Sequence, residues 1–360
     1  MSTPTIDVTP MDRTAIRVRV EAALYEFLGR KAESAAAAGL PADVVDAVRS
    51  FLFAGGKRIR PLFCVLGWYA GGGAELPDSV VRVAAAVELF HAAVLIHDDI
   101  IDDSDTRRDQ PTVHRAVADR KRTVHDRSAA ARFGTHAALL IGDFGLVWSQ
   151  ELLHTAGLTA AQNAAATPIL DAMRTEVNYG QYLDLLTTGR PTRDLDQALE
   201  IIRYKTAAYT VQRPLQLGAA LAGASPEVLA ALSGYGVPLG EAFQLQDDLL
   251  GVFGDPTRTG KSTLDDLREG KHTVLLALAL RDATPEHRAQ LDALIGNPRL
   301  DARGAARCRE ILTATARPEV ERMIRDRWLQ VQRTLARAPF PPDAVAGLRS
   351  IADAVIARTS

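Results

Sequence analysis

Cysteines, lysines and uncharged apolar runs are all scarce in this chain, and each scarcity narrows what the protein can be. Two cysteines among 360 residues, Cys64 and Cys308, are too few for a disulfide framework and fit a reducing cytoplasm. We find no signal peptide and no uncharged apolar run of about 20 residues, so we expect a soluble chain without a transmembrane segment. A formal net charge of −2 gives no reason to expect nucleic acid as a partner.

Strand-like alternation is also scarce, whereas Ala-rich helical runs are frequent. Hydrophobic residues make up 47% of the chain, enough for a large core, and no Pro-, Gly- or Ser-rich linker divides it. We therefore expect an all-α fold with a single domain over residues 11–360 and a flexible tail over residues 1–10. We interpret the arginine-rich residues 109–132 as a solvated connection. The helices expected before residue 230 cover residues 11–39, 42–53, 77–102, 137–153, 169–186 and 198–223.

The most informative stretch is HDDIIDDSDTRR, residues 97–108, at the end of one expected helix. Asp98 and Asp102 are four residues apart and therefore share one helix face, with Asp99 beside the first. Magnesium takes oxygen ligands and commonly bridges a carboxylate to a substrate phosphate. Arg107 and Arg108 follow directly, and guanidinium groups pair well with phosphate oxygens. This stretch predicts a magnesium-dependent diphosphate site.

A second acidic doublet, Asp247 and Asp248, lies in FQLQDDLLGVFGD at residues 243–255. One doublet on a helix is usually a solvated face, but both doublets here lie among apolar residues. Buried carboxylates must be paired or bind metal. We therefore expect the two doublets to face one another across a helical bundle and to hold magnesium ions over a diphosphate.

Short cationic motifs complete the pattern. In AGGKRIRP, residues 54–61, Lys57 and Arg60 open a helix, whose N-terminus attracts anions, although scattered loop charge is an equally good interpretation. His91 shares a helix face with Asp98, which favours a phosphate contact over an ordinary core histidine. Only six of the 42 basic residues are lysines, and lysine provides a compact charge suited to phosphate. Four of them lie in Gly- or Thr-flanked motifs: Lys57, Lys205, Lys261 and Lys271.

One motif is misleading. The segment GDPTRTGKS, residues 254–262, resembles a P-loop, but five residues separate Gly254 from Gly260 where a P-loop has four. It also follows an expected helix rather than a strand. We interpret it as a flexible loop that lets Lys261 reach phosphate, and EGKHT at residues 269–273 brings Lys271 likewise.

Together these motifs resemble the trans-isoprenyl diphosphate synthases of the polyprenyl synthetase family. GGKRIRP, HAAVLIHDDIIDDSDTRR, GQYLD, KT, FQLQDD, TGK and GK occur in the family's order between residues 55 and 273. The resemblance implies an all-α bundle around a deep central active-site cavity, usually as a homodimer. It implies head-to-tail condensation of isopentenyl diphosphate with an allylic diphosphate, whether dimethylallyl, geranyl or farnesyl.

The resemblance also implies individual roles. Three magnesium ions would be held by the two acidic motifs, with Asp99 in support, through Asp98, Asp102, Asp247 and Asp248. Isopentenyl diphosphate would be bound by Lys57, Arg60, His91 and Arg108. The allylic diphosphate and the reacting region would be lined by Arg107, Lys205, Thr206, Gln181, Phe243, Gln244, Lys261 and Lys271. The residues expected to be catalytic are Asp98, Asp99, Asp102, Arg107, Lys205 and Asp247.

The second acidic motif departs from the family pattern. Its usual form is Asp-Asp-x-x-Asp, but the fifth position here is Gly251, and Asp255 follows four residues too late. Since the leading aspartate makes the direct metal contact in the family, we expect activity to survive with altered binding of the third metal ion.

Product length is expected to depend on the helix that precedes Asp98. Family members that stop at fifteen carbons carry an aromatic residue where this chain has Ala93 and Val94. One turn deeper, Phe90 is large enough to stop growth, which favours the twenty-carbon geranylgeranyl diphosphate, since a helical turn of about 5.4 Å matches one isoprene unit. Ordinary core packing of Phe90 is the competing interpretation, and farnesyl and longer products are alternatives.

Two other functions are considered. A class I terpene cyclase shares the helical fold and magnesium-triggered ionisation, but it lacks the isopentenyl diphosphate residues represented here by GGKRIRP and Arg108. An inert subunit of a heteromeric synthase would have lost acidic or basic residues, and only Gly251 points that way. Product identification separates all of these.

Overall fold

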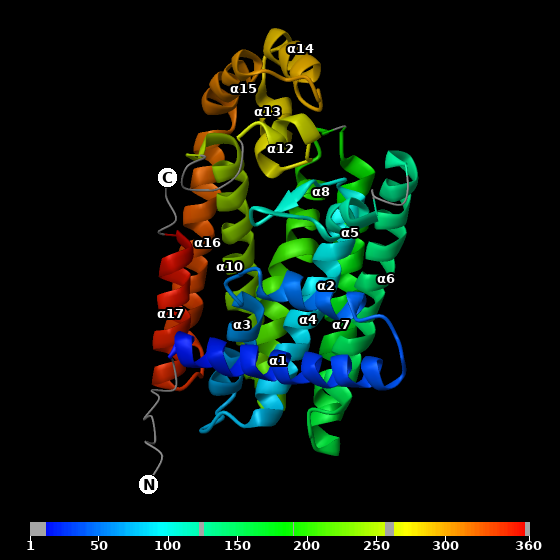
Figure 1. Ribbon diagram of the computed structural model, residues 1–360. Coiled ribbons are helices and arrows are strands. Elements are labelled where there is room, and N and C mark those ends of the chain that lie inside the picture. The colour runs from blue at the N-terminus through cyan, green and yellow to red at the C-terminus, as the bar shows by residue number, and fades with distance from the viewer. Residues whose placement is uncertain (1–11, 122–125, 190, 256–262, 357–360) are drawn as a thin grey trace. The chain divides into compact units, whose positions relative to one another are not determined.

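The computed structural model describes residues 12–121, 126–189, 191–255 and 263–356. Within these residues nearly all regular structure is helical (Figure 1). The described strands are two short ones, β1 (Thr106–Arg107) and β2 (Gln110–Pro111), which pair antiparallel with Thr106 opposite Pro111. The all-α prediction is therefore confirmed. The chain folds into two compact units, which are described separately, and the single-domain boundary stays a prediction. The expected tail at residues 1–10 lies outside the described residues.

Unit 1 comprises residues 1–65 and 74–163. Its long helix α4 packs against α1, α2, α5 and α6, and the buried side of α4 is built mainly of Val and Ala. Asp126 caps α6 by accepting a hydrogen bond from the Ala129 N–H at 2.8 Å, as expected for an N-cap aspartate. The elements of this unit are α1 (Arg13–Ala37), α2 (Asp43–Phe53), the first half of α3 (Ile59–Ala70), α4 (Asp78–Ile101), β1, β2, α5 (Val113–Lys121) and α6 (Arg127–His154).

Helix α4 is long and apolar enough to cross a membrane when judged by length and composition alone. However, 72% of its apolar stretch is buried inside the protein. The central helix of a folded core meets the same criterion, because a helix that is apolar all round must be buried on all sides. Its apolar character is therefore accounted for by its central position in unit 1.

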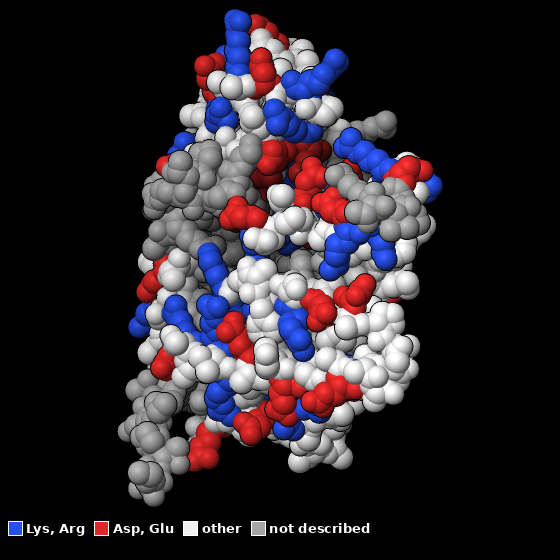
Figure 2. Space-filling view, in the orientation of Figure 1, with Lys and Arg blue, Asp and Glu red and all other residues white. Residues whose placement is uncertain are grey.

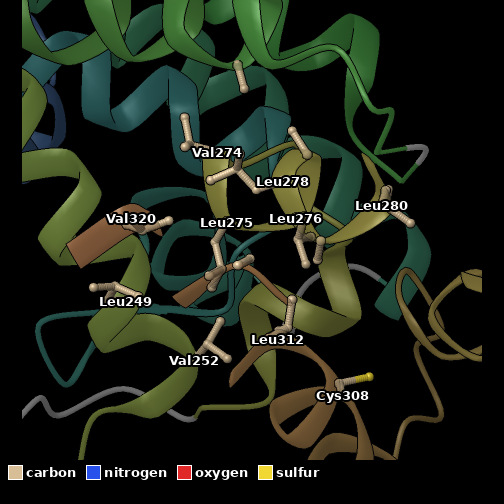
Figure 3. Packing of buried hydrophobic residues seen from close by; sticks show 14 of the residues in the cluster. Leu249, Val252, Val274, Leu275, Leu276, Leu278, Leu280, Cys308, Leu312 and Val320 are labelled. Atoms are coloured by element: carbon tan, nitrogen blue, oxygen red, sulfur yellow. The ribbon is translucent and has the colours of Figure 1, made fainter. Parts of the chain in front are cut away.

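Unit 2 comprises residues 66–73 and 164–360. Helix α10 packs against η1, a π-helix, and against α16. Helix α13 is buried over residues 274–280 and contributes Val274, Leu275 and Leu278 to a core that α10, α15 and α16 complete (Figure 3). The elements are α7 (Ala160–Thr187), α8 (Leu195–Ile201), η1 (Ile202–Gln212), α9 (Arg213–Leu221), α10 (Pro226–Phe253), α12 (Asp265–Glu269), α13 (Val274–Asp282), α14 (Pro285–Leu294), α15 (Ala302–Thr315), α16 (Arg317–Arg337) and α17 (Pro342–Ile356).

Three expectations about helices need correction. The described part of residues 109–132 is not simply a solvated connection, because it contains α5 and the start of α6. The arginines of α5 hide an amphipathic pattern in which Val113, His114, Val117 and Ala118 are buried. Helices α6 and α7 each begin about ten residues earlier than expected, and Pro168 lies inside α7. Residues 198–223 form α8, η1 and α9 rather than one uniform helix.

Charged side chains of both signs are interspersed over the visible face, as the small net charge suggests (Figure 2).

Candidate active site

The first acidic motif lies at the C-terminal end of α4 in unit 1. Asp98 and Asp99 belong to the last turn, and Asp102 is the C-cap, whose N–H bonds the Asp98 carbonyl at 2.9 Å. The strands β1 and β2 turn the chain back, so that Arg107 contacts the carboxylates of Asp98 and Asp99. Its side chain lies 2.7 Å from Asp99 Oδ1 and 3.4 Å from Asp98 Oδ2. Residues with positive φ, including Asp103 and Arg108, allow this tight return.

The carboxylates of this motif fit a hard cation. Asp99 is 1% exposed, and its Oδ2 has no hydrogen-bond partner among the described residues. Burial raises the pKa of Asp99 to about 6, and Arg107 opposes that shift. Within the described ranges no group of three or more His, Cys, Asp or Glu side chains has the geometry of a self-sufficient metal site. Magnesium is often bound by one or two carboxylates and completed by substrate phosphates, so oxygen donors of this kind suit it.

A cluster of cationic groups surrounds His91 in the same unit. Burial lowers the pKa of His91 well below its ordinary value, and the guanidinium groups of Arg60, Arg108, Arg107 and Arg58 lower it further. His91 is therefore a neutral imidazole among four positive charges. Such a concentration of guanidinium groups attracts an anion and matches phosphate oxygens. Three of the residues predicted to bind isopentenyl diphosphate, namely Arg60, His91 and Arg108, are brought together here.

Arg58 is a buried anchor and does not face solvent. Its side chain is 3% exposed and pairs with Glu88 at 3.0 Å and with Glu21 at 3.2 Å. It also donates to the Leu52 carbonyl at 2.5 Å and to the Gly55 carbonyl at 3.2 Å. These contacts fix the loop before α3, so that Lys57, the neighbouring residue, remains exposed. No signal in the sequence separates Arg58 from its cationic neighbours.

Gly56 is required where Arg108 crosses this loop. Its φ of +123° is unfavourable for other residues, and a Cβ there would lie 3.0 Å from Arg108 Nη2 and from Arg58 Nη1. Arg108 in turn donates to the Gly55 carbonyl. The Gly-Gly pair thus provides both the backbone conformation and the room for two guanidinium groups.

In unit 2, three of the predicted residues, Thr206, Gln244 and Asp248, are linked by hydrogen bonds, and Lys205 forms a separate ion pair. Thr206 Oγ1 donates to Gln244 Oε1 at 2.8 Å, and Gln244 Nε2 donates to Asp248 Oδ1 at 2.8 Å. Lys205 Nζ contacts Asp184 Oδ2 of α7 at 2.6 Å. Asp184 belongs to the GQYLD motif, and its role as the partner of Lys205 is an addition from the structure.

Lys205 and Thr206 lie on the π-helix η1, whose wide turns are accommodated by glycines on the neighbouring helices. A Cβ at Gly180 of α7 would lie 2.4 Å from the Lys205 nitrogen. A Cβ at Gly240 of α10 would lie 2.4 Å from Ala207 Cα. π-Helical segments are frequent at functional sites, and this one places two predicted ligand residues on consecutive positions.

The two aspartates of the second motif have different surroundings. Asp247 is exposed, whereas Asp248 is buried. Burial raises the pKa of Asp248 to about 8, the like charges of Asp247 and Asp266 add to the shift, and Gln244 and Lys271 oppose it. Lys271 pairs with Glu269 at 2.9 Å. Gln181 and Phe243 are partly exposed on α7 and α10, and Lys261 lies outside the described residues.

The predicted chain-length residues lie in the middle of α4. Phe90 is 5% exposed and Ala93 is fully buried, while Val94 is partly exposed. A Cβ on Gly145 of α6 would lie 2.9 Å from the Ala93 Cβ. A small residue at position 93 is therefore also demanded by the close approach of α6, independently of product length. That the two acidic motifs face one another stays a prediction.

Comparisons with known proteins show which family this chain is similar to. The model of the polyprenyl synthetase family matches residues 42–312. The crystal structure of geranylgeranyl pyrophosphate synthase from Corynebacterium glutamicum, complexed with isoprenyl diphosphate and magnesium, has a TM-score of 0.90 and 40% sequence identity, and the match covers 98% of this chain and 100% of that one. The short chain isoprenyl diphosphate synthase of Methanothermobacter thermautotrophicus is 34% identical over 257 residues, 71% of this chain and 73% of that protein. The octaprenyl diphosphate synthase of Escherichia coli is 35% identical over 250 residues, 68% of this chain and 69% of that protein.

Proposed function

This chain belongs to the polyprenyl synthetase family and is a prenyltransferase, and on that premise we propose that Asp98, Asp102 and the cationic cluster around His91 carry its reaction. The reaction is the magnesium-dependent, head-to-tail condensation of isopentenyl diphosphate with an allylic diphosphate. The observation that carries the proposal is that Arg107 joins two carboxylates of the acidic motif, while Arg60, Arg107 and Arg108 surround one neutral histidine. A diphosphate needs cations at one end and metal-binding carboxylates nearby, and unit 1 offers both.

The chain's own residues bind and orient two diphosphates. Arg60, His91, Arg108 and the exposed Lys57 hold the isopentenyl diphosphate, whereas Arg107 and Lys205 hold the allylic one. Magnesium, when bound by Asp98, Asp102, Asp247 and Asp248, would neutralise the allylic diphosphate and favour its departure. We assign three ions, as the family resemblance implies, and the magnesium in the structure of the C. glutamicum relative supports the choice of metal.

Bond changes need no protein nucleophile. The allylic C–O bond breaks and its electron pair leaves with the diphosphate, while cationic side chains stabilise the developing negative charge. The double bond of isopentenyl diphosphate forms the new C–C bond. A proton is then lost from the adjacent carbon, and the departing diphosphate accepts it. This explains why no general base among the described residues is required beside the two acidic motifs.

We assign geranylgeranyl diphosphate as the main product. Phe90 is buried on α4 two turns before Asp98, which supports its role as the floor of the tail-binding region. Farnesyl and longer products are the alternatives, because the relatives include a short chain synthase and an octaprenyl synthase.

In the decisive experiment, the purified protein is incubated with magnesium, isopentenyl diphosphate and one of three primers, which are dimethylallyl, geranyl and farnesyl diphosphate. The dephosphorylated alcohols are then identified. Geranylgeraniol as the main product supports both the reaction and its length, and a cyclic hydrocarbon would indicate a terpene cyclase. No turnover of any primer by folded protein would contradict the reaction itself. Phe90→Ala should then lengthen the products. Leu89→Ala, an equally buried neighbour, controls for a loosened core, and the assignment fails if both variants give the wild-type distribution.

A homodimer is supported by the surface of α6. Leu140, Phe144 and Val147 follow one another at helical spacing and are 57%, 42% and 62% exposed. An exposed apolar stripe on one helix face is typical of a protein interface. Sedimentation of the wild type and of Val147→Glu tests this, since the variant should sediment as a monomer if this stripe forms the contact.

A cytoplasmic location is supported by the cysteines. Cys64 and Cys308 are both free and buried, and burial raises the pKa of their thiols to about 12 and about 11. Neither thiol is suited to forming a disulfide in an oxidising compartment. Fractionation of cells that produce the tagged protein tests the location.

A further inference from the structure

His272 is a buried histidine of unit 2 to which the proposed reaction assigns no role. It lies between α12 and α13, directly after Lys271, and is 3% exposed. Both of its ring nitrogens contact the backbone of a segment about 80 positions earlier in the sequence, the connection between α7 and α8. Nδ1 lies 3.2 Å from the Thr192 nitrogen, and Nε2 lies 3.0 Å from the Asp194 carbonyl oxygen.

These two partners fix the protonation state of the ring. The Thr192 N–H can only donate, so Nδ1 must carry a lone pair, and the Asp194 carbonyl can only accept, so Nε2 must carry the proton. The neutral Nε2–H imidazole is the form that satisfies both. Burial favours the same form, because it lowers the pKa of His272, while the backbone contact with Asp194 and the negative charges of Asp194 and Asp184 oppose that shift.

A second contact joins the same two segments. The Gly189 N–H donates to the Gly270 carbonyl at 3.2 Å. A Cβ on Gly270 would lie 3.2 Å from the Gly189 Cα, so the two backbones approach closely. The Thr273 N–H donates to the Lys271 carbonyl at 2.9 Å, so the chain turns tightly at His272 before α13 begins. The loop that carries Lys271 is therefore attached to the α7–α8 connection at two points.

The segments that His272 joins border two lysines expected to act on the allylic diphosphate. Lys271 directly precedes His272. Asp184, whose Oδ2 lies 2.6 Å from Lys205 Nζ, is in the last turn of α7, just before the connection. Lys205 itself lies on η1, which follows α8, and α8 has Asp194 as its N-cap. A shift of the connection would therefore displace the Lys205–Asp184 pair relative to Lys271.

We propose that His272 is a positioning residue for prenyl transfer. Its neutral ring holds the α7–α8 connection against the loop of Lys271, which keeps this lysine and the Lys205–Asp184 pair in place for the allylic diphosphate. The inference rests on the proposed function, because it assigns that substrate to these lysines. The residues proposed for isopentenyl diphosphate all belong to unit 1, so loss of His272 should affect one substrate and leave the other unaffected.

Two substitutions separate hydrogen bonding from packing. His272→Leu can neither accept nor donate a hydrogen bond, whereas His272→Gln keeps a neutral side chain with an acceptor and a donor. His287→Leu is the matched control, because it makes the same exchange at a partly exposed histidine on α14. The kcat and the KM for each substrate are measured with magnesium and the primer that the wild type elongates fastest. Thermal melts verify folding, and His272→Met replaces His272→Leu if the latter does not fold.

His272→Leu should raise the KM for the allylic primer about tenfold, since a small misplacement of groups that position a substrate commonly costs that much or more. The KM for isopentenyl diphosphate should not change. His272→Gln should recover most of the loss, and His287→Leu should match the wild type. An unchanged allylic KM in His272→Leu would overturn the proposal. An equal rise of both KM values, or a His272→Gln variant as impaired as His272→Leu, would also overturn it.

Failure of this role for His272 is distinguishable from failure of the proposed function. Prenyl transfer by the wild type reports the function alone. If the wild type elongates its primer while His272→Leu keeps its allylic KM, the function stands and the role of His272 is wrong. If the wild type elongates no primer, the reaction is wrong, and calorimetric binding of inorganic pyrophosphate with magnesium decides the role. Weaker binding by His272→Leu than by His272→Gln then supports it, and equal binding overturns it.

Discussion

Gly240→Ala is the substitution whose consequences the structure specifies most sharply. The residue lies on α10 where that helix meets the π-helix η1. A Cβ added there would lie 2.4 Å from Ala207 Cα and 2.8 Å from Ala207 Cβ. Both atoms are backbone or backbone-attached, so no side-chain rotation can relieve the contact. The helices must separate locally by about 1 Å to turn this 2.4 Å approach into an ordinary van der Waals contact.

The expected change in unfolding free energy is the sum of two opposing contributions. Overpacking in a core costs about 1–3 kcal/mol. Replacing glycine by alanine inside a helix returns about 1 kcal/mol. Because Ala207 contacts the new Cβ with backbone atoms that cannot rotate away, we expect an overpacking cost near 3 kcal/mol. The net loss of unfolding free energy in Gly240→Ala should then be about 2 kcal/mol. Gly234→Ala on the same helix is the matched control. Its Cβ would meet only Thr334 side-chain atoms at 3.6 Å, so it should be neutral or stabilising by up to about 1 kcal/mol.

Urea unfolding of the wild type, Gly240→Ala and Gly234→Ala measures these free energies.

A second consequence concerns ligand binding, because Ala207 follows Lys205 and Thr206 directly. Displacing η1 should raise the KM for the allylic diphosphate several-fold in Gly240→Ala and leave it unchanged in Gly234→Ala. A Gly240→Ala protein within about 0.5 kcal/mol of wild type would refute the packing argument. A destabilised protein with an unchanged KM would refute the link between η1 and the substrate.

Two further predictions concern buried charges. Arg58→Met should lower the free energy of unfolding in urea by about 3–5 kcal/mol, because it leaves Glu88, which is 5% exposed, without its buried partner. The double variant Arg58→Met/Glu88→Leu should recover most of this loss. No recovery would contradict the pairing. Burial raises the pKa of Asp248 from 3.8 to about 8, so its neutral form contributes stability that is complete below about pH 4 and lost as the pH rises through 8. Asp248→Asn keeps the neutral form, and its thermal midpoint should therefore gain on the wild type between about pH 4 and pH 8 in metal-free buffer. A constant difference over this range would show that Asp248 does not titrate there.

Local spacing predicted the part of the site that depends on one helix. The four-residue interval between Asp98 and Asp102 put both aspartates at the end of α4, and the two arginines that follow were expected beside them. The structure brings Arg107 to Asp98 and Asp99 because β1 and β2 return the chain within a few residues. Contacts this local are encoded in neighbouring residues, so a single sequence is enough to predict them.

The features that the sequence did not predict depend on tertiary contacts. Nothing local distinguishes η1 from an α-helix, since its wide turns depend on Gly180 and Gly240 of other helices. Asp266 lies beside Gly251 although the two residues are more than ten positions apart in the sequence. Helix α5 is a different case, because its apolar positions at 113, 117 and 118 were visible, but the arginines around them favoured a solvated segment. The arginine-rich composition of this segment outweighed the helical spacing of its apolar residues in the prediction.

If the proposed function holds, the pairing of cations with carboxylates at the end of α4 predicts that metal and diphosphate bind together. Arg107 pairs with Asp98 and Asp99, and Lys205 pairs with Asp184. A diphosphate that drew Arg107 away would leave Asp99 buried and unpaired, which is costly. A magnesium ion alone would repel Arg107 while leaving it without an anion. When both arrive, the metal satisfies the carboxylate and the phosphate satisfies the guanidinium, so neither charge is left unpaired. Under the proposed function, this exchange gives the protein a physical reason to bind a metal–diphosphate complex in preference to either component.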